Sequence, residues 1–251
     1  MNFLHWLCVC VFIHSTLTDQ IEPRIYGGEE LRTNIHKYLV KLVKKYDTHA
    51  LSICSGSIIN HQWIISSAHC FPDDVTFVEV QKPGIPGSSK IATLKKSQII
   101  IYPGYTPFLR EYSNYENDLA LLKTTRRIKF NDYVQPISLP SSSVAIGQEV
   151  TIAGYGMSEK GISGPREGNT LISSCKFIVF NNLICTYDSV TAGSGDSGGP
   201  MVSNNELLGV ISSSCKNVET EKYCVTVSVN VSRVIMNARR TGLCNTAILF
   251  C

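Results

Sequence analysis

The feature that most constrains the fold of this chain is a series of short apolar or alternating segments. Gly-, Pro- and Ser-rich turns separate them, for example at 82–89 and 161–168. Segments of this length and spacing are typical of an all-β sandwich or barrel. One helix is expected near the C-terminus, at about 231–240. The predicted strands are 38–43, 57–59, 63–65, 76–80, 98–101, 119–122, 150–153, 177–180, 206–211 and 223–229.

The hexapeptide Gly-Asp-Ser-Gly-Gly-Pro at 195–200 is a candidate nucleophile loop. A serine hydroxyl is a poor nucleophile at neutral pH, so it needs a base to take its proton and donors to hold the oxyanion that forms. Glycines on both sides of Ser197 permit a sharp turn, so the N–H groups of Gly195 and Ser197 could point at one place. Taken alone, the hexapeptide also fits a Gly/Ser-rich surface turn.

Two further segments supply the groups that such a serine needs. His69 follows a strand-like apolar run, and Asp118 stands at the start of another. Each residue alone has an ordinary structural explanation, since most histidines, aspartates and serines take no part in chemistry. Their joint occurrence in the order His69, Asp118, Ser197, each within its own motif, indicates a catalytic Ser/His/Asp set.

With these motifs the chain resembles the trypsin/chymotrypsin-like serine proteases, from Ile25 to about Asn237. The order of the three residues is the chymotrypsin order and not that of subtilisin or the α/β-hydrolases. The resemblance implies two packed six-stranded antiparallel β-barrels, at about 25–135 and 145–240, with a short C-terminal helix. The matching segments outside the three motifs are Ile25-Tyr26-Gly27-Gly28, Gly56-Ser57-Ile58-Ile59, Tyr102-Pro103-Gly104-Tyr105 and Gly154-Tyr155-Gly156.

The resemblance also implies the roles of the site residues. Ser197 would attack the scissile carbonyl, His69 would move the proton, and Asp118 would orient His69. The N–H groups of Gly195 and Ser197 would hold the oxyanion. The reaction would need no metal or organic cofactor. Expected partners are protein or peptide substrates and protein inhibitors, and we expect a monomer.

Features near the N-terminus predict secretion and activation by cleavage. Residues 3–13 form an apolar run too short to span a bilayer, followed by small residues, as in a signal peptide. We therefore expect a signal peptide at about 1–16, a propeptide at 17–24 and a peptidase domain at 25–251. Cleavage after Arg24 by a trypsin-like protease would free the amine of Ile25, which by the resemblance would pair with Asp196. A net charge of +3 gives no argument for a nucleic acid or a membrane partner.

Eight cysteines remain once the signal peptide is set aside, and an even number in a secreted chain suggests disulfides. By the resemblance, Cys54–Cys70 and Cys175–Cys185 match bridges of the family. Cys215–Cys224 and Cys244–Cys251 then follow by elimination. The cysteines and histidines lack the spacing of a metal site. Asn230 begins the chain's glycosylation sequon.

The specificity pocket departs from the family pattern. Thr191 stands at the position that resembles the pocket floor, where trypsin-like members carry an aspartate to pair with Lys or Arg. Ala192, Ser212, Ser214 and Cys224 would line the pocket, and Cys224 falls near a position usually held by glycine. We therefore expect cleavage after a small or medium uncharged residue. The alternative is a catalytically impaired homologue that acts as a binding or decoy protein.

Overall fold

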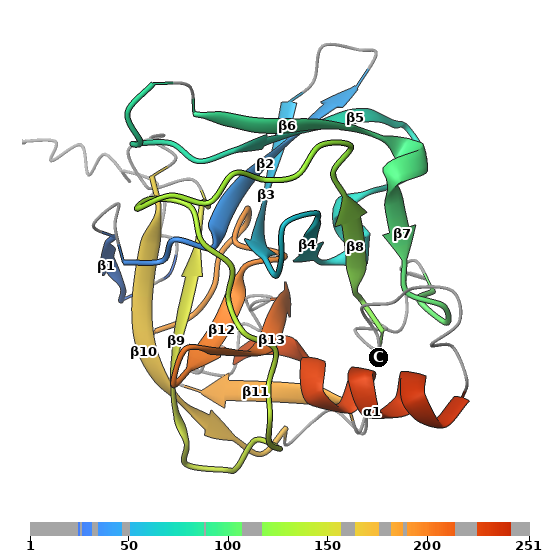
Figure 1. Ribbon diagram of the computed structural model, residues 1–251. Coiled ribbons are helices and arrows are strands. Elements are labelled where there is room, and N and C mark those ends of the chain that lie inside the picture. Colours follow the sequence, from blue (N-terminus) through green and yellow to red (C-terminus); the bar gives the residue numbers. More distant parts are fainter. Residues whose placement is uncertain are drawn as a thin grey trace, which may run out of the picture.

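The computed structural model describes residues 25, 27–31, 35–46, 51–87, 89–106, 117–156, 164–175, 182–187, 190–213 and 225–241. Two antiparallel sheets make up most of this part of the chain, and a C-terminal helix follows them (Figure 1). The predicted all-β class with a short C-terminal helix is confirmed. The expected signal peptide and propeptide lie outside the described residues.

The first sheet comes from the N-terminal half of the chain and has the strand order β6-β5-β2-β3-β4-β8-β7. It is curled, and its edge strands β6 and β7 are consecutive in the chain, separated only by a 3-10 turn at Lys96–Gln98. This turn explains why the sheet has seven strands where six were expected. The bounds are β2 (Leu39–Tyr46), β3 (Leu51–Ile58), β4 (Trp63–Ser66), β5 (Val75–Gln81), β6 (Lys90–Lys95), β7 (Ile99–Ile101) and β8 (Ala120–Lys123).

The second sheet closes into the expected six-stranded barrel, in the order β10-β11-β14-β13-β12-β9 with β9 pairing back to β10. One short strand from the N-terminal half of the chain adds to this sheet. It is β1 (Glu29–Glu30), which pairs with the Arg166–Glu167 end of β10. The bounds are β9 (Glu149–Gly154), β10 (Arg166–Ser173), β11 (Leu183–Tyr187), β12 (Pro200–Ser203), β13 (Glu206–Ser213) and β14 (Val225–Asn230).

The interiors of both sheets are filled by the residues whose alternation predicted the strands. In β5, for example, Val78 and Val80 are fully buried, whereas Glu79 between them is partly exposed. Five strands escaped prediction because they are short or carry little apolar signal, and one of them is β1 with its two glutamates. Strand β10 begins Arg-Glu-Gly-Asn-Thr, and β6, β11 and β12 are short or mixed. The strand predicted at 177–180 lies outside the described residues.

Helix α1 (Val231–Thr241) follows β14 directly and begins with a side-chain cap. The Asn230 side-chain oxygen accepts hydrogen bonds from the Arg233 amide at 3.2 Å and the Ser232 hydroxyl at 2.8 Å, so it satisfies one backbone N–H of the first turn. Asn230 is 3% exposed. An attached glycan would have no room there, so the structure argues against glycosylation at this sequon. No helix within the described residues is long and apolar enough to cross a membrane.

Candidate active site

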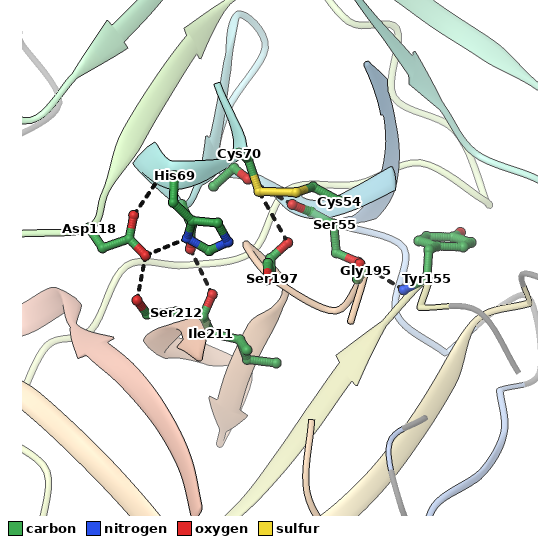
Figure 2. Close-up of a disulfide and its surroundings, with 12 residues drawn as sticks. Cys54, Ser55, His69, Cys70, Asp118, Tyr155, Gly195, Ser197, Ile211 and Ser212 are labelled. Carbon is green, nitrogen blue, oxygen red and sulfur yellow. Dashed lines mark hydrogen bonds and ion pairs between the residues drawn. A yellow bond between two sulfur atoms is a disulfide. The ribbon is translucent and has the colours of Figure 1, made fainter. Parts of the chain in front are cut away.

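The three predicted catalytic residues come from both sheets. His69 lies on the 3-10 turn Ala68–Cys70 that follows β4, and Asp118 lies just before β8. Ser197 lies on the loop before β12 of the second sheet. The two sheets meet at this loop, because the Cys70 sulfur next to His69 is 3.8 Å from the Ser197 carbonyl oxygen (Figure 2).

His69 and Asp118 form a doubly hydrogen-bonded pair. The His69 Nδ1 atom lies 2.7 Å from Asp118 Oδ2, and the His69 amide donates to Asp118 Oδ1 at 2.8 Å (Figure 2). The Ser212 hydroxyl, from β13 of the second sheet, donates a further short bond to Asp118 Oδ2. Asp118 is buried, whereas a quarter of the His69 side chain is exposed. A carboxylate only accepts, so Nδ1 carries the proton and Nε2 is left as a base.

The backbone before Asp118 explains its position. Asn117 has a φ of 62°, in the left-handed region that Asn tolerates better than most residues, and the Leu119 amide bonds back to the Asn117 carbonyl at 2.7 Å. The Asn117 side chain is held by Gly104 at 3.4 Å and by the Asn182 amide at 3.1 Å. This tight turn presents Asp118 to His69 at the start of β8.

Ser55 of β3 fixes the nucleophile loop against the first sheet. Its amide donates to the Ser197 carbonyl at 2.8 Å, and its hydroxyl donates to the Gly195 carbonyl at 3.0 Å. The same hydroxyl accepts the Tyr155 amide at 2.8 Å (Figure 2). With the Gly195 and Ser197 carbonyls held on this side, neither of their amides has a hydrogen-bond partner among the described residues. Those two N–H groups are the predicted oxyanion donors.

The carboxylate of Asp196 is buried beneath this loop and accepts three backbone N–H groups. The Gly156 amide donates to Oδ1 at 2.8 Å, the Gly193 amide to Oδ2 at 2.8 Å and the Ile25 nitrogen to Oδ2 at 3.2 Å. Asp196 is 1% exposed and Ile25 is fully buried. A Cβ at Gly154 or Gly156 would collide with the Asp196 side chain, which explains the glycines in that motif.

Comparisons with known proteins identify the family of this chain. The trypsin family model matches residues 25–236, which is most of the chain. The chain belongs to the trypsin family. It is 29% identical to trypsin-1 of Salmo salar over 76% of this chain and 80% of that protein. It is 28% identical to trypsin I-P1 of Gallus gallus over 81% and 84%, and 26% identical to the serine protease VLSP-3 of Macrovipera lebetinus over 75% and 76%.

Two of the four predicted disulfides are present, Cys54–Cys70 and Cys175–Cys185. The first lies directly beside His69 and Ser55 and so ties β3 to the histidine turn (Figure 2). Cys215, Cys224, Cys244 and Cys251 lie outside the described residues, as do Arg24 and Ser214. Among the side chains that the structure describes, no group of three or more His, Cys, Asp or Glu is placed to hold a metal ion.

The predicted pocket floor is buried and uncharged. Thr191 and Ala192 are fully buried, and the Ala192 amide donates to the Thr226 hydroxyl at 2.9 Å. The Thr191 hydroxyl has no hydrogen-bond partner within the described part of the chain. Ser212 has a role that the sequence did not reveal, because its hydroxyl contacts Asp118 and only the fold brings residues 94 positions apart together.

Gly198 provides a test of how closely the loop is packed. An added Cβ would overlap the Ser66 hydroxyl and the Ser55 carbonyl, and φ is +82°. We expect Gly198→Ala to lower the free energy of unfolding by about 2–4 kcal/mol, measured by urea denaturation. The control is Gly147→Ala, which has the same φ of +82° but open space around it; it should cost only about 1–2 kcal/mol. Equal losses in the two variants would contradict close packing at Gly198.

Proposed function

We propose that this protein is a secreted serine endopeptidase that uses Ser197, His69 and Asp118. The observation that carries the proposal is the His69–Asp118 pair, with its 2.7 Å bond at Nδ1, beside a loop whose serine is fixed by Ser55. The family membership supports the same class of activity. Disulfides are typical of proteins in oxidising compartments, which supports secretion.

The proposed reaction uses each residue in one role. The unprotonated Nε2 of His69 takes the proton of the Ser197 hydroxyl as its oxygen attacks the carbonyl carbon of the substrate. The Gly195 and Ser197 amides donate to the oxyanion of the tetrahedral intermediate. Imidazolium then gives the proton to the leaving amine, and Asp118 stabilises the charge on His69 meanwhile. Water repeats the sequence to release the acyl group from Ser197.

We further propose that cleavage after Arg24, by a trypsin-like protease, activates the protein. The Ile25 nitrogen already lies 3.2 Å from Asp196 Oδ2. Cleavage would turn this nitrogen into an ammonium group, and a charge-assisted hydrogen bond to a buried carboxylate is stronger than one from a neutral amide. The bond would stabilise the conformation of residues 193–197, and with it the oxyanion donors.

The proposed substrates carry an uncharged residue before the scissile bond. Thr191 and Ala192 supply no negative charge, and both are fully buried. A buried lysine or arginine side chain without a carboxylate partner is costly. The Thr191 hydroxyl, which has no hydrogen-bond partner among the described residues, would instead favour a side chain that is apolar or able to share one hydrogen bond.

Labelling with a fluorophosphonate probe tests the proposed nucleophile and its activation. We expect protein cleaved after Arg24 to be labelled at least about tenfold faster than uncleaved protein, and the Ser197→Ala variant not to be labelled. The control is Ser194→Ala, an exposed serine on the same loop, which should keep its labelling. If folded, cleaved wild-type protein is not labelled, the three residues do not form a functional catalytic triad. The hypothesis of a binding or decoy protein is then favoured.

A panel of peptide amides that differ only in the residue before the scissile bond tests the pocket. We expect kcat/KM for the best uncharged residue to exceed that for Arg or Lys by about tenfold or more, because a cation would be buried without a partner. The variant Thr191→Asp should shift the ratio toward Arg and Lys. Fastest cleavage after Arg or Lys by the wild type would rule the proposed preference out.

A further inference from the structure

A buried cluster of ionisable side chains lies away from the candidate active site, between the two sheets. His36 and Tyr38 lie just before β2, and Lys82 follows β5 of the same sheet. Glu167 belongs to β10 of the other sheet. His36, Tyr38 and Lys82 are 8%, 6% and 2% exposed, and the Glu167 side chain is 17% exposed.

Both ring nitrogens of His36 are engaged. Nε2 lies 2.6 Å from Glu167 Oε2, and Nδ1 lies 2.7 Å from the Tyr38 hydroxyl. A neutral imidazole satisfies all three groups at once, because Nε2–H donates to the carboxylate and the hydroxyl donates to Nδ1. A protonated imidazole would instead place two hydrogens between Nδ1 and the Tyr38 oxygen. The Tyr38 hydrogen would then have to turn away within a buried site.

Lys82 holds the His36 backbone against the first sheet, and its positive charge disfavours protonation of the His36 ring. Its Nζ donates to the His36 carbonyl at 2.5 Å and to the Leu39 carbonyl at 2.8 Å. Burial lowers the pKa of Lys82 to about 8. Burial is also the largest influence on His36, and it lowers the pKa of the imidazole below 6.5; the bond to Glu167 opposes this shift and the charge of Lys82 adds to it.

Glu167 lies on the edge of β10 that holds the segment beginning at Ile25. Glu29 pairs with Glu167, and the Arg166 guanidinium donates to the Gly28 carbonyl at 2.5 Å. A Cβ added at Gly168 would lie 3.3 Å from both the Ile25 side chain and the Gly28 backbone. The His36–Glu167 bond therefore connects the start of β2 to the same short stretch of β10 on which Ile25–Glu30 rests.

We propose that the His36–Glu167 pair is an acid-sensitive latch that positions the segment carrying Ile25 against strand β10. The inference rests on the proposed function to the extent that this segment delivers the Ile25 amine to Asp196. His36 and Glu167 are thus positioning residues for a site that they do not touch. Acidification opens the latch, and the oxyanion donors lose the support of the docked segment.

The sign of the pH effect follows from the charges that face His36. These are Glu167 on β10, Lys82 after β5 and the Tyr38 hydroxyl just before β2, with Arg166 and Glu29 flanking Glu167. Because burial depresses the pKa of docked His36, the undocked segment binds a proton more readily. Docking is therefore fully stable above about pH 6.5 and weakens as the pH falls below that value.

Hydrogen exchange measured by mass spectrometry tests the latch without relying on catalysis. The sample is the protein that begins at Ile25 after cleavage behind Arg24. It carries Ser197→Ala so that it cannot digest itself. Exchange of residues 27–31 and 164–168 is compared at pH 7.5 and pH 5.5, after correction for the intrinsic rate. We expect protection to fall by up to about tenfold at pH 5.5, because this pH lies one unit below the usual histidine pKa of 6.5 and the undocked segment is then mostly protonated.

Two histidine variants separate the latch from a general effect of acid. In His36→Gln the amide can donate to Glu167 and accept from Tyr38 but cannot titrate, so protection should change less than about twofold with pH. In His61→Gln, where the ring bonds Ile128 and stacks on Phe130, the wild-type pH dependence should remain. Equal protection of the wild type at both pH values, or an equal loss of protection in His36→Gln, would overturn the latch.

Failed fluorophosphonate labelling at pH 7.5 would overturn the protease proposal, whereas these exchange results would remain valid.

Discussion

The buried carboxylate of Asp196 is the interaction on which the rest of the site depends. The Asp196 side chain is buried from solvent, and its negative charge is stabilised by hydrogen bonds from the N–H groups of Ile25, Gly156 and Gly193. These donors come from three separate parts of the chain, so all three parts have to be in place for these hydrogen bonds to form. The loop that carries Ser197 is therefore fixed by the folding of distant segments.

The second constraint is that the candidate catalytic residues come from different sheets. Beside the site, three serines make hydrogen bonds between the two sheets: Ser55, Ser67 and Ser212. Ser55 holds the carbonyl oxygens of the Ser197 loop, and the Ser67 hydroxyl donates to the Ile211 carbonyl at 2.7 Å. Ser212 reaches Asp118 from the second sheet. These contacts set the relative position of His69 and the loop, which the proposed proton transfer requires.

The sequence predicted the fold class and pointed to three candidate catalytic residues, because each left a local signal. Apolar alternation marked strands such as β5, and the glycines around Ser197 marked a turn that close packing against Ser55 and Ser66 demands. The polar β10 gave no such signal, although it carries Glu167 and the edge that receives Ile25. The pairing of His36 with Glu167 spans 131 positions and joins two sheets, so no local sequence pattern predicts it.

The rate of peptide cleavage by the Asp196→Asn variant, cleaved after Arg24, tests the central claim most directly. Asparagine has nearly the same size but cannot balance the Ile25 ammonium, and its NH2 group would face a backbone donor. Breaking a buried pair costs about 3–5 kcal/mol, so the account predicts a loss of roughly a hundredfold to a thousandfold or more in kcat/KM, with circular dichroism unchanged. A folded variant with activity within about threefold of the wild type would contradict it.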